Sequence, residues 1–297
     1  MEGVNIMKKE IIIEQIIMKN IRRKNVDVDH VQVVEGEPFI AWLEINPTEL
    51  CNRTCTFCPR VDPDDCPNQN LNMTVTLAKK MADELFELEY QGSVAFSGYG
   101  EPLLTPNIEK IINQFGDINV EVVTNGDPLN KKMIKDLYDA GLNTMVISMY
   151  DGPFQIDKFN KLFKDAGISE DKYVLRDRWY GEDEDFGLLL TNRSGTVNEG
   201  NQPAVNPMKR CFYTHYSMVV DWNGDVLLCT QDWNKKVKFG NIYSNTLLES
   251  WQSSGLSKYR KTLGNGFRKY EPCKSCNVDG TLMGSNHAEA WDKKKHR

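Results

Sequence analysis

From about Phe39 to Val174 the apolar residues change repeatedly between two spacings. Short apolar runs typical of strands are separated by segments in which apolar residues recur every three or four positions, as in helices. The strands predicted from this pattern are residues 41–45, 93–97, 120–123, 144–149 and 173–175. The helices predicted between them are residues 76–88, 106–115, 131–140 and 154–166. The alternation predicts an α/β fold in which crossover helices join parallel strands, as in a complete or partial TIM-like barrel.

The remainder of the chain has a different pattern. Residues 179–207 combine an acidic run with a polar stretch, which predicts loops or a lid. Asn223-Gly224 separates two apolar runs, a strong hairpin signal. Residues 246–263 have helical features, and a final helix or frayed tail is expected from about residue 285. We therefore predict three parts: an N-terminal helical extension (1–38), a barrel domain (39–205) and a C-terminal hairpin-plus-helix domain (206–297).

The N-terminal residues 6–23 are apolar on much of one helical face. A helix packed on the main domain and a helix that binds a partner or a membrane surface both fit this pattern. No stretch approaches the ~20 consecutive apolar residues of a membrane span. The polar pair Glu14-Gln15 interrupts the apolar run, and no small-residue cleavage site follows. A signal peptide is therefore not predicted, and the cytoplasm is the expected compartment.

Composition and charge narrow the class of protein. The chain has 297 residues, enough for one large domain or two moderate ones. Its 36 basic and 42 acidic residues give a net charge of −6. This balance gives little electrostatic support to a nucleic-acid partner. Without export a disulfide framework is disfavoured, so grouped cysteines indicate metal or redox sites.

Two sets of cysteines carry the candidate chemistry. Cys51, Cys55 and Cys58 form a compact CxxxCxxC triplet directly after the first predicted strand. A second set is spread over the last third of the chain and comprises Cys211, Cys229, Cys273 and Cys276. Three thiolates can hold three irons of a four-iron cluster and leave the fourth iron open, whereas four thiolates can close a cluster completely. For the second set, a structural zinc is an alternative.

The first set resembles the motif of the radical S-adenosylmethionine (radical SAM) enzymes, and Phe57 supplies the aromatic residue usual before the third cysteine. Residues 97–102, Ser-Gly-Tyr-Gly-Glu-Pro, resemble the glycine-rich segment that meets the methionyl amine of the cofactor in that family. Glycines let backbone approach a ligand closely, and a carboxylate can accept hydrogen bonds from an amine. The resemblance implies that Gly98, Gly100 and Glu101 bind S-adenosylmethionine.

Further cofactor contacts implied by the resemblance follow the later strands. Asn125 ends the third strand and Ser148 lies near the end of the fourth, where the family often contacts the ribose and the methionyl carboxylate. Arg176 and Arg178, after the fifth strand, are candidates for the carboxylate. A plain turn at Asn125, a structural hydroxyl at Ser148 and surface salt bridges for the arginines are alternatives. The family's apolar adenine motif is not evident here.

The second cysteine set, together with the hairpin, resembles the auxiliary-cluster extension called SPASM in its long form and Twitch in its short form. The absence of cysteines after Cys276 is typical of the short form. The resemblance implies two 4Fe-4S clusters, a flavodoxin- or ferredoxin-type reductant and a truncated barrel with about five strands before the extension. The layout is similar to that of the Twitch-type dehydrogenases of aminocyclitol biosynthesis.

The resemblance implies an enzyme that generates a 5′-deoxyadenosyl radical, which abstracts hydrogen from a small polar substrate. Oxidation of a sugar or cyclitol alcohol, with the auxiliary cluster as electron acceptor, is the favoured reaction. Candidate substrate contacts are Arg193, Arg210, Gln231 and Asp232. Peptide modification and redox-neutral epimerisation, with Cys66 as hydrogen donor, are alternatives. A free thiol at Cys66 and a zinc-stabilised binding module with no enzymatic role are the plainer interpretations.

Overall fold

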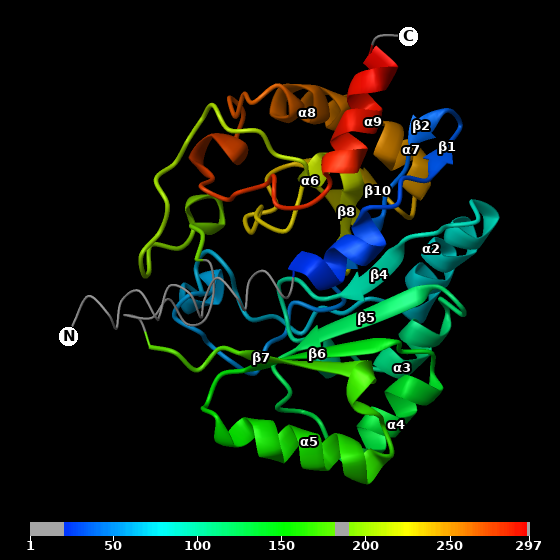
Figure 1. Cartoon of the computed structure of the whole chain (residues 1–297), viewed down its shortest axis with the longest axis vertical. Helices are drawn as coiled ribbons and strands as arrows, with labels where there is room; N and C mark the ends of the chain where they lie inside the picture. Colours follow the sequence, from blue (N-terminus) through cyan, green and yellow to red (C-terminus); the bar gives the residue numbers. More distant parts are fainter. Residues whose placement is uncertain (1–20, 182–189, 296–297) are drawn as a thin grey trace.

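The computed structural model describes residues 21–181 and 190–295. Its central feature is one eight-stranded sheet with the strand order β10-β9-β8-β3-β4-β5-β6-β7 (Figure 1). Five strands of the predicted barrel and β8 run parallel, and the hairpin strands β9 and β10 are antiparallel to their neighbours. The strands are β3 (Trp42–Ile45), β4 (Ser93–Phe96), β5 (Asn119–Thr124), β6 (Thr144–Met149), β7 (Tyr173–Asp177), β8 (Ser217–Val220), β9 (Asp225–Leu227) and β10 (Lys238–Asn241). The prediction of an α/β fold with a mostly parallel sheet is confirmed.

Helices connect the parallel strands and also build the C-terminal part. Figure 1 shows α2 to α5 along one side of the sheet, while α6 to α9 gather with the C-terminus in the upper part of the view. The helices are α2 (Val75–Glu87), α3 (Ile108–Asn113), α4 (Lys131–Asp139), α5 (Phe154–Ala166), α6 (Tyr213–Tyr216), α7 (Leu247–Gln252), α8 (Ser254–Gly264) and α9 (Ser285–Lys295). Strands β1 (Val33–Val34) and β2 (Glu37–Pro38) form a separate small hairpin. Among the described residues no helix is long and apolar enough to cross a membrane.

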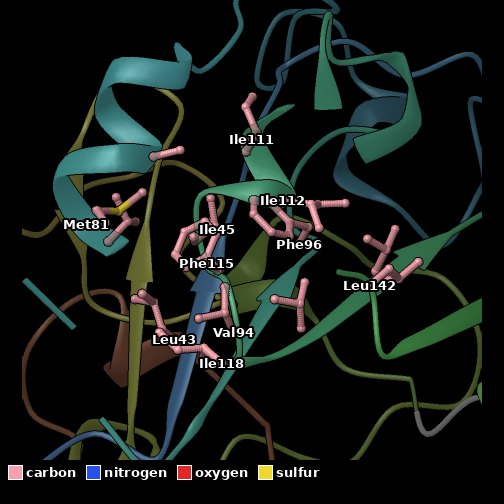
Figure 2. Close-up of a cluster of buried hydrophobic side chains, with 14 of the residues drawn as sticks. Leu43, Ile45, Met81, Val94, Phe96, Ile111, Ile112, Phe115, Ile118 and Leu142 are labelled. Carbon is pink, nitrogen blue, oxygen red and sulfur yellow. The ribbon is translucent and has the colours of Figure 1, made fainter. Parts of the chain in front are cut away.

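Alternation along the strands separates the main core from the inner face of the half-barrel. Leu43, Ile45, Val94 and Phe96 pack into the large core against the crossover helices, part of which Figure 2 shows. Residues at the intervening positions point to the other face. Polar side chains there can line a cavity while the core stays apolar.

The structure adds two details to the C-terminal predictions. Residues 246–263 form two helices, because Ser253 is extended in ψ (143°) and its side chain caps α8 by accepting from the Leu256 N–H. The boundary predicted near residue 205 does not interrupt the sheet. Strand β8 pairs with β3 along its whole length, so the hairpin extends the barrel sheet. A side-chain cap decides the break between the two helices, and pairing between distant residues decides the extension of the sheet. Hydrophobic periodicity reports neither of them.

The described end of the predicted N-terminal helix, residues 21–28, is helical; most of the predicted span, 6–20, lies outside the described residues. Arg23 forms an ion pair with Glu121 of β5, and Val28 packs with Trp42 and Phe212. This helix is therefore joined to the inner face of the sheet, as the interpretation of a helix packed on the main domain requires.

A polar network joins the C-terminal part to the loop that leaves β3. The side-chain amide of Asn46 donates to Asp221 Oδ1 at 2.7 Å and to Glu49 Oε1 at 3.1 Å. Lys235 forms ion pairs with both carboxylates, at 2.6 Å from Asp221 Oδ2. Since Asp221 follows β8 and Lys235 lies beyond the hairpin strand β9, the network ties the two halves of the molecule together.

Replacing Lys235 with Met should test this tie. The buried carboxylate of Asp221 would lose its cation, and we expect the free energy of unfolding in urea to fall by about 2 kcal/mol. Adding Asp221→Asn should recover part of that loss, because the uncompensated charge is then removed. Lys132→Met, which removes an exposed surface pair with Asp136, is the control and should behave like wild type. Equal stability of the Lys235 variant and this control would contradict the role of the network.

Candidate active site

The carboxyl ends of the parallel strands meet at one edge of the sheet, as expected for such folds. A cleft of about 420 Å³ opens there. Many residues that the sequence predicted as site residues line it: Cys51, Cys55, Phe57, Cys58, Gly98, Gly100, Glu101, Asn125, Ser148, Arg176, Arg178, Arg193 and Gln231. The structure thus brings together side chains from five strand ends and from the segment after β9.

The loop with the first three cysteines is held over the cleft by Arg53. Its guanidinium bonds to Asp127 at 2.6 Å and to Asp151 at 2.7 Å, which follow β5 and β6. Burial and the neighbouring thiols raise the pKa of Cys55 to about 12, and burial also raises the pKa of Cys58. With raised pKa values, these thiols ionise readily only beside a positively charged group. The irons of an open iron–sulfur cluster supply that charge to three cysteines.

The glycine-rich segment passes close to the backbone of the cysteine loop. A Cβ at Gly100 would lie 2.2 Å from the carbonyl oxygen of Thr48 and 2.8 Å from that of Leu50. Gly98 has a φ of +117°, which disfavours any other residue. The Asn46 side-chain oxygen accepts from the backbone N–H of Tyr99 at 2.9 Å. The network that ties the two halves of the molecule therefore also fixes this segment.

Glu101 is buried at the centre of the site. Its carboxylate accepts from Thr124 Oγ1 at 2.6 Å and from the backbone N–H groups of Asn125 (2.8 Å) and Leu103 (3.1 Å). Burial raises the pKa of Glu101 to about 7 against these hydrogen bonds. A carboxylate has about four acceptor positions, so one position is left for a donor on a ligand.

Ser148 and Arg176 lie on adjacent strands and interact directly. Arg176 donates to Ser148 Oγ at 2.9 Å, and its buried Nε has no hydrogen-bond partner in the structure. Arg178 donates to the carbonyl oxygen of Asp177 at 2.9 Å. The two guanidiniums line the cleft beside Tyr150, whose ring lies 5.8 Å from that of Phe57. This corner can bind an anionic group such as a carboxylate.

The second cysteine set, Cys211, Cys229, Cys273 and Cys276, lines a second pocket. Burial, followed by the mutual repulsion of the thiolates, raises the pKa of Cys229 well above its ordinary value. A Cβ at Gly280 would lie 2.2 Å from Cys211 Sγ, so any residue larger than glycine would collide with this sulfur. The donor set and the cavity fit a closed iron–sulfur cluster.

A buried arginine holds the loop with Cys276 in place. Arg268 is 2% exposed and donates to the carbonyl oxygens of Cys276 (3.0 Å) and Val278 (2.8 Å). It also donates to the carbonyl oxygen of Lys209 at 2.9 Å. The guanidinium lowers the pKa of Cys211 and Cys273 against the stronger effect of burial.

Two of the substrate contacts proposed from the sequence, Arg210 and Asp232, lie outside the cleft lining. Arg210 donates to the carbonyl oxygen of Gly264 at 2.6 Å and pairs with Asp292 at 3.2 Å. Asp232 is 1% exposed and accepts from the backbone N–H groups of Lys236 and Val237, which fixes a turn. Both side chains have structural partners, so the geometry gives no support to a substrate contact.

Cys66 faces a different hollow, on the other side of the Tyr99 and Trp233 rings, which are T-shaped with centroids 4.9 Å apart. Burial raises the pKa of Cys66 to about 11. A hydrogen donor must reach the substrate, and this thiol does not line the cleft.

Sequence reasoning missed several cleft residues. Arg53 stands inside the cysteine motif, and its two aspartate partners each follow a predicted strand, which was an available signal. Tyr213 and Thr230 adjoin the second cysteine set and line the cleft as well. Lys24 comes from the N-terminal helix and had no local signal, since only the fold brings it to the cleft.

Comparisons with known proteins agree with this arrangement. The radical SAM superfamily matches residues 45–174, and the SPASM iron–sulfur cluster-binding domain matches residues 211–277. The S-adenosyl-L-methionine-dependent 2-deoxy-scyllo-inosamine dehydrogenase of Niallia circulans is 28% identical over 247 residues, which cover 81% of this chain and 94% of the relative. The GTP 3′,8-cyclase of Campylobacter jejuni is 32% identical over 166 residues, 53% of this chain and 47% of that enzyme.

Solved structures extend the likeness to the fold. BtrN in complex with AdoMet and 2-DOIA has a TM-score of 0.69 and 25% identity, covering 85% of this chain and 98% of that one. SuiB of Streptococcus suis bound to its precursor peptide SuiA has a TM-score of 0.57 at 16% identity, covering 82% and 70%, which shows a shared fold alone. With both cysteine sets inside matched domains, the chain combines a radical SAM domain with a C-terminal SPASM iron–sulfur domain, and it is an oxidoreductase.

Proposed function

We propose that this enzyme oxidises an alcohol of a small polar substrate, a sugar or cyclitol, and uses two 4Fe-4S clusters and S-adenosylmethionine. One observation carries the proposal. Cys229 lines the cavity of the second cysteine set, and the next residues, Thr230 and Gln231, line the cleft of the first. A substrate in the cleft therefore lies beside a fully ligated redox site, as a two-electron oxidation requires.

The ligand geometry favours a cluster over zinc at the second site. Four cysteines that bind one zinc ion converge on a single point. Within residues 21–181 and 190–295, no three cysteine, histidine or acidic side chains converge in this way. The four thiols instead line one pocket together. A cluster of four irons and four sulfides is much wider than an ion, so its ligands stand further apart than those of a single zinc ion.

In the first site, Cys51, Cys55 and Cys58 would hold an open cluster, and the second set would hold a closed one in residues 206–297. When bound, the open cluster with S-adenosylmethionine supplies an acceptor for one hydrogen atom, and the closed cluster supplies an acceptor for one electron. The alcohol carbon loses its C–H hydrogen, the hydroxyl loses a proton, and one further electron leaves, which balances a two-electron oxidation to a ketone.

The residues of the cleft have separate tasks in this scheme. We assign the methionyl amine to Glu101, the methionyl carboxylate to the corner of Ser148 and Arg176, and the substrate side to Arg193 and Gln231. Gln231 is held by Thr191, whose hydroxyl donates to it at 2.9 Å. The named activity of the Niallia relative, a dehydrogenase acting on an aminocyclitol, supports the substrate class.

Iron content and turnover of an auxiliary-site variant test the function. Anaerobically purified protein should hold about eight irons, and Cys273→Ala/Cys276→Ala about four. That variant should still cleave S-adenosylmethionine but form no ketone from polyols, because the second electron has no acceptor. Cys66→Ala is the control and should keep both activities; loss of product with retained cofactor cleavage would instead support epimerisation. Full ketone formation by the auxiliary variant would refute the scheme.

Gly100→Ala tests the close approach of the glycine-rich segment. The added methyl group would collide with backbone carbonyls, so the segment must shift. We expect S-adenosylmethionine to bind at least about tenfold more weakly, in line with the strain of overpacking. Equilibrium binding to the reconstituted protein measures this. Gly181→Ala, where the methyl group would meet nothing within 4 Å, is the matched control; equal affinity of both variants would count against the assignment.

The pH dependence of cofactor binding tests Glu101. Its pKa is raised to about 7, so the ionised form that accepts from an amine is populated mainly above that pH. The apparent KM for S-adenosylmethionine should be constant above about pH 8 and rise by up to about tenfold per unit well below pH 7. Glu101→Gln removes the titration and should flatten the profile. An identical slope in that variant would assign the pH dependence to another group.

A further inference from the structure

The helix of residues 21–28 closes the inner face of the half-barrel. Arg23 pairs with Glu121 on β5, and Val28, 1% exposed, packs in a small core with Trp42 of β3. Asn286 and His287 of α9 hold the following residues by side-chain bonds to the carbonyl oxygens of Asp29 and His30. The radical SAM match covers residues 45–174, so this helix lies before the matched residues.

Lys24 projects from this helix into a small pocket that adjoins the cleft. The pocket and the cleft share Lys24, Glu44, Tyr213, Thr230 and Met283 in their linings. Cys229 of the auxiliary set lines the same pocket. A molecule held here is close to the cofactor side and to the auxiliary side at once.

The lining of this pocket combines apolar ring faces with charges of both signs. The ammonium of Lys24 lies 4.2 Å from the centroid of the Trp42 ring. Glu44 on β3 accepts from Ser97 Oγ at 2.5 Å, which fixes its carboxylate. Tyr213 and Tyr216 add aromatic surface. A polyhydroxylated ring matches this set, because its C–H faces pack on aromatic rings while its hydroxyl groups donate to a carboxylate and accept from an ammonium.

We infer that Lys24 and Glu44 are specificity-determining residues that bind neighbouring hydroxyl groups of a cyclitol or sugar ring in this pocket. The inference rests on the proposed function for its substrate class, yet it concerns binding and can be tested apart from oxidation. It makes the N-terminal helix a part of the substrate site. An enzyme that shares only the matched domains would lack this contact.

Lys24→Met, Lys24→Arg and Glu44→Gln test the inference in the reconstituted holoenzyme with S-adenosylmethionine. Arg22→Met, an exposed cation on the same helix, is the matched control. The probes are 2-deoxy-scyllo-inosamine and scyllo-inositol, with cyclohexanol as a ring that lacks neighbouring hydroxyls. Binding is measured by saturation-transfer NMR and calorimetry, and KM and kcat are measured separately.

We expect Lys24→Met and Glu44→Gln to weaken binding of the polyol probes by at least about tenfold, as for loss of a charged hydrogen bond. Lys24→Arg should retain most of the affinity, and S-adenosylmethionine cleavage without substrate should match that of Arg22→Met. Unchanged probe affinity in Lys24→Met would overturn the inference, as would failure of every polyol to bind the wild type. A melting temperature of Lys24→Met well below that of the control, with affinity intact, would make Lys24 structural.

The two proposals fail in different ways. Probe binding that depends on Lys24 but gives no ketone would reject the oxidation and keep the pocket. Ketone formation with equal KM in wild type and Lys24→Met would keep the oxidation and reject the pocket.

Discussion

Burial of thiols is the constraint on which the rest of the site depends. At Cys55 in the first set and Cys229 in the second, burial is the main cause that raises the thiol pKa, and the neighbouring thiols add to it. The protein supplies only partial compensation, such as the guanidinium of Arg268 near the second set. Each set therefore needs a positively charged group to stabilise its thiolates, and the iron of a cluster supplies that charge. The ion pairs of Arg53 and the hydrogen bonds of Arg268 hold the loops that carry these sulfurs.

The two sites work together only if their separation is fixed. The sheet contributes, because β8 of the C-terminal part pairs with β3, the strand that leads into the first cysteine loop. Asn46 adds a second link at the end of β3, since one side chain contacts Asp221 after β8 and the backbone of Tyr99 in the glycine-rich segment. A substrate that exchanges a hydrogen atom at one site and an electron at the other needs such a rigid spacing.

Local pattern was sufficient for the barrel and for the cysteine sets. The predicted helix 154–166 coincides with α5, and each barrel strand was placed within two residues at both ends, because short buried strands and amphipathic helices differ in period. Contacts between distant residues had no such signal. Arg23 meets Glu121 98 residues later, and Asn46 meets Asp221 175 residues later. The prediction for Asp232 lacked a signal for the same reason. Gln231 and Asp232 both follow Cys229 closely in the sequence, and only the turn geometry brings Gln231 to the cleft and keeps Asp232 away from it.

The division between shared and added parts gives a physical account of specificity. In our proposal, cofactor contacts come from strand ends of the matched barrel, among them the glycines and Glu101. The proposed substrate contacts Gln231 and Lys24 come from the segment after Cys229 and from the N-terminal helix, whereas Glu44 lies on β3. The hydrogen-abstraction step requires the same cofactor geometry for any substrate, so those strand ends cannot change freely. In our proposal, a helix joined to the sheet through an ion pair and a small apolar core can change its side chains without disturbing those strand ends, and selection among ring substrates can act there.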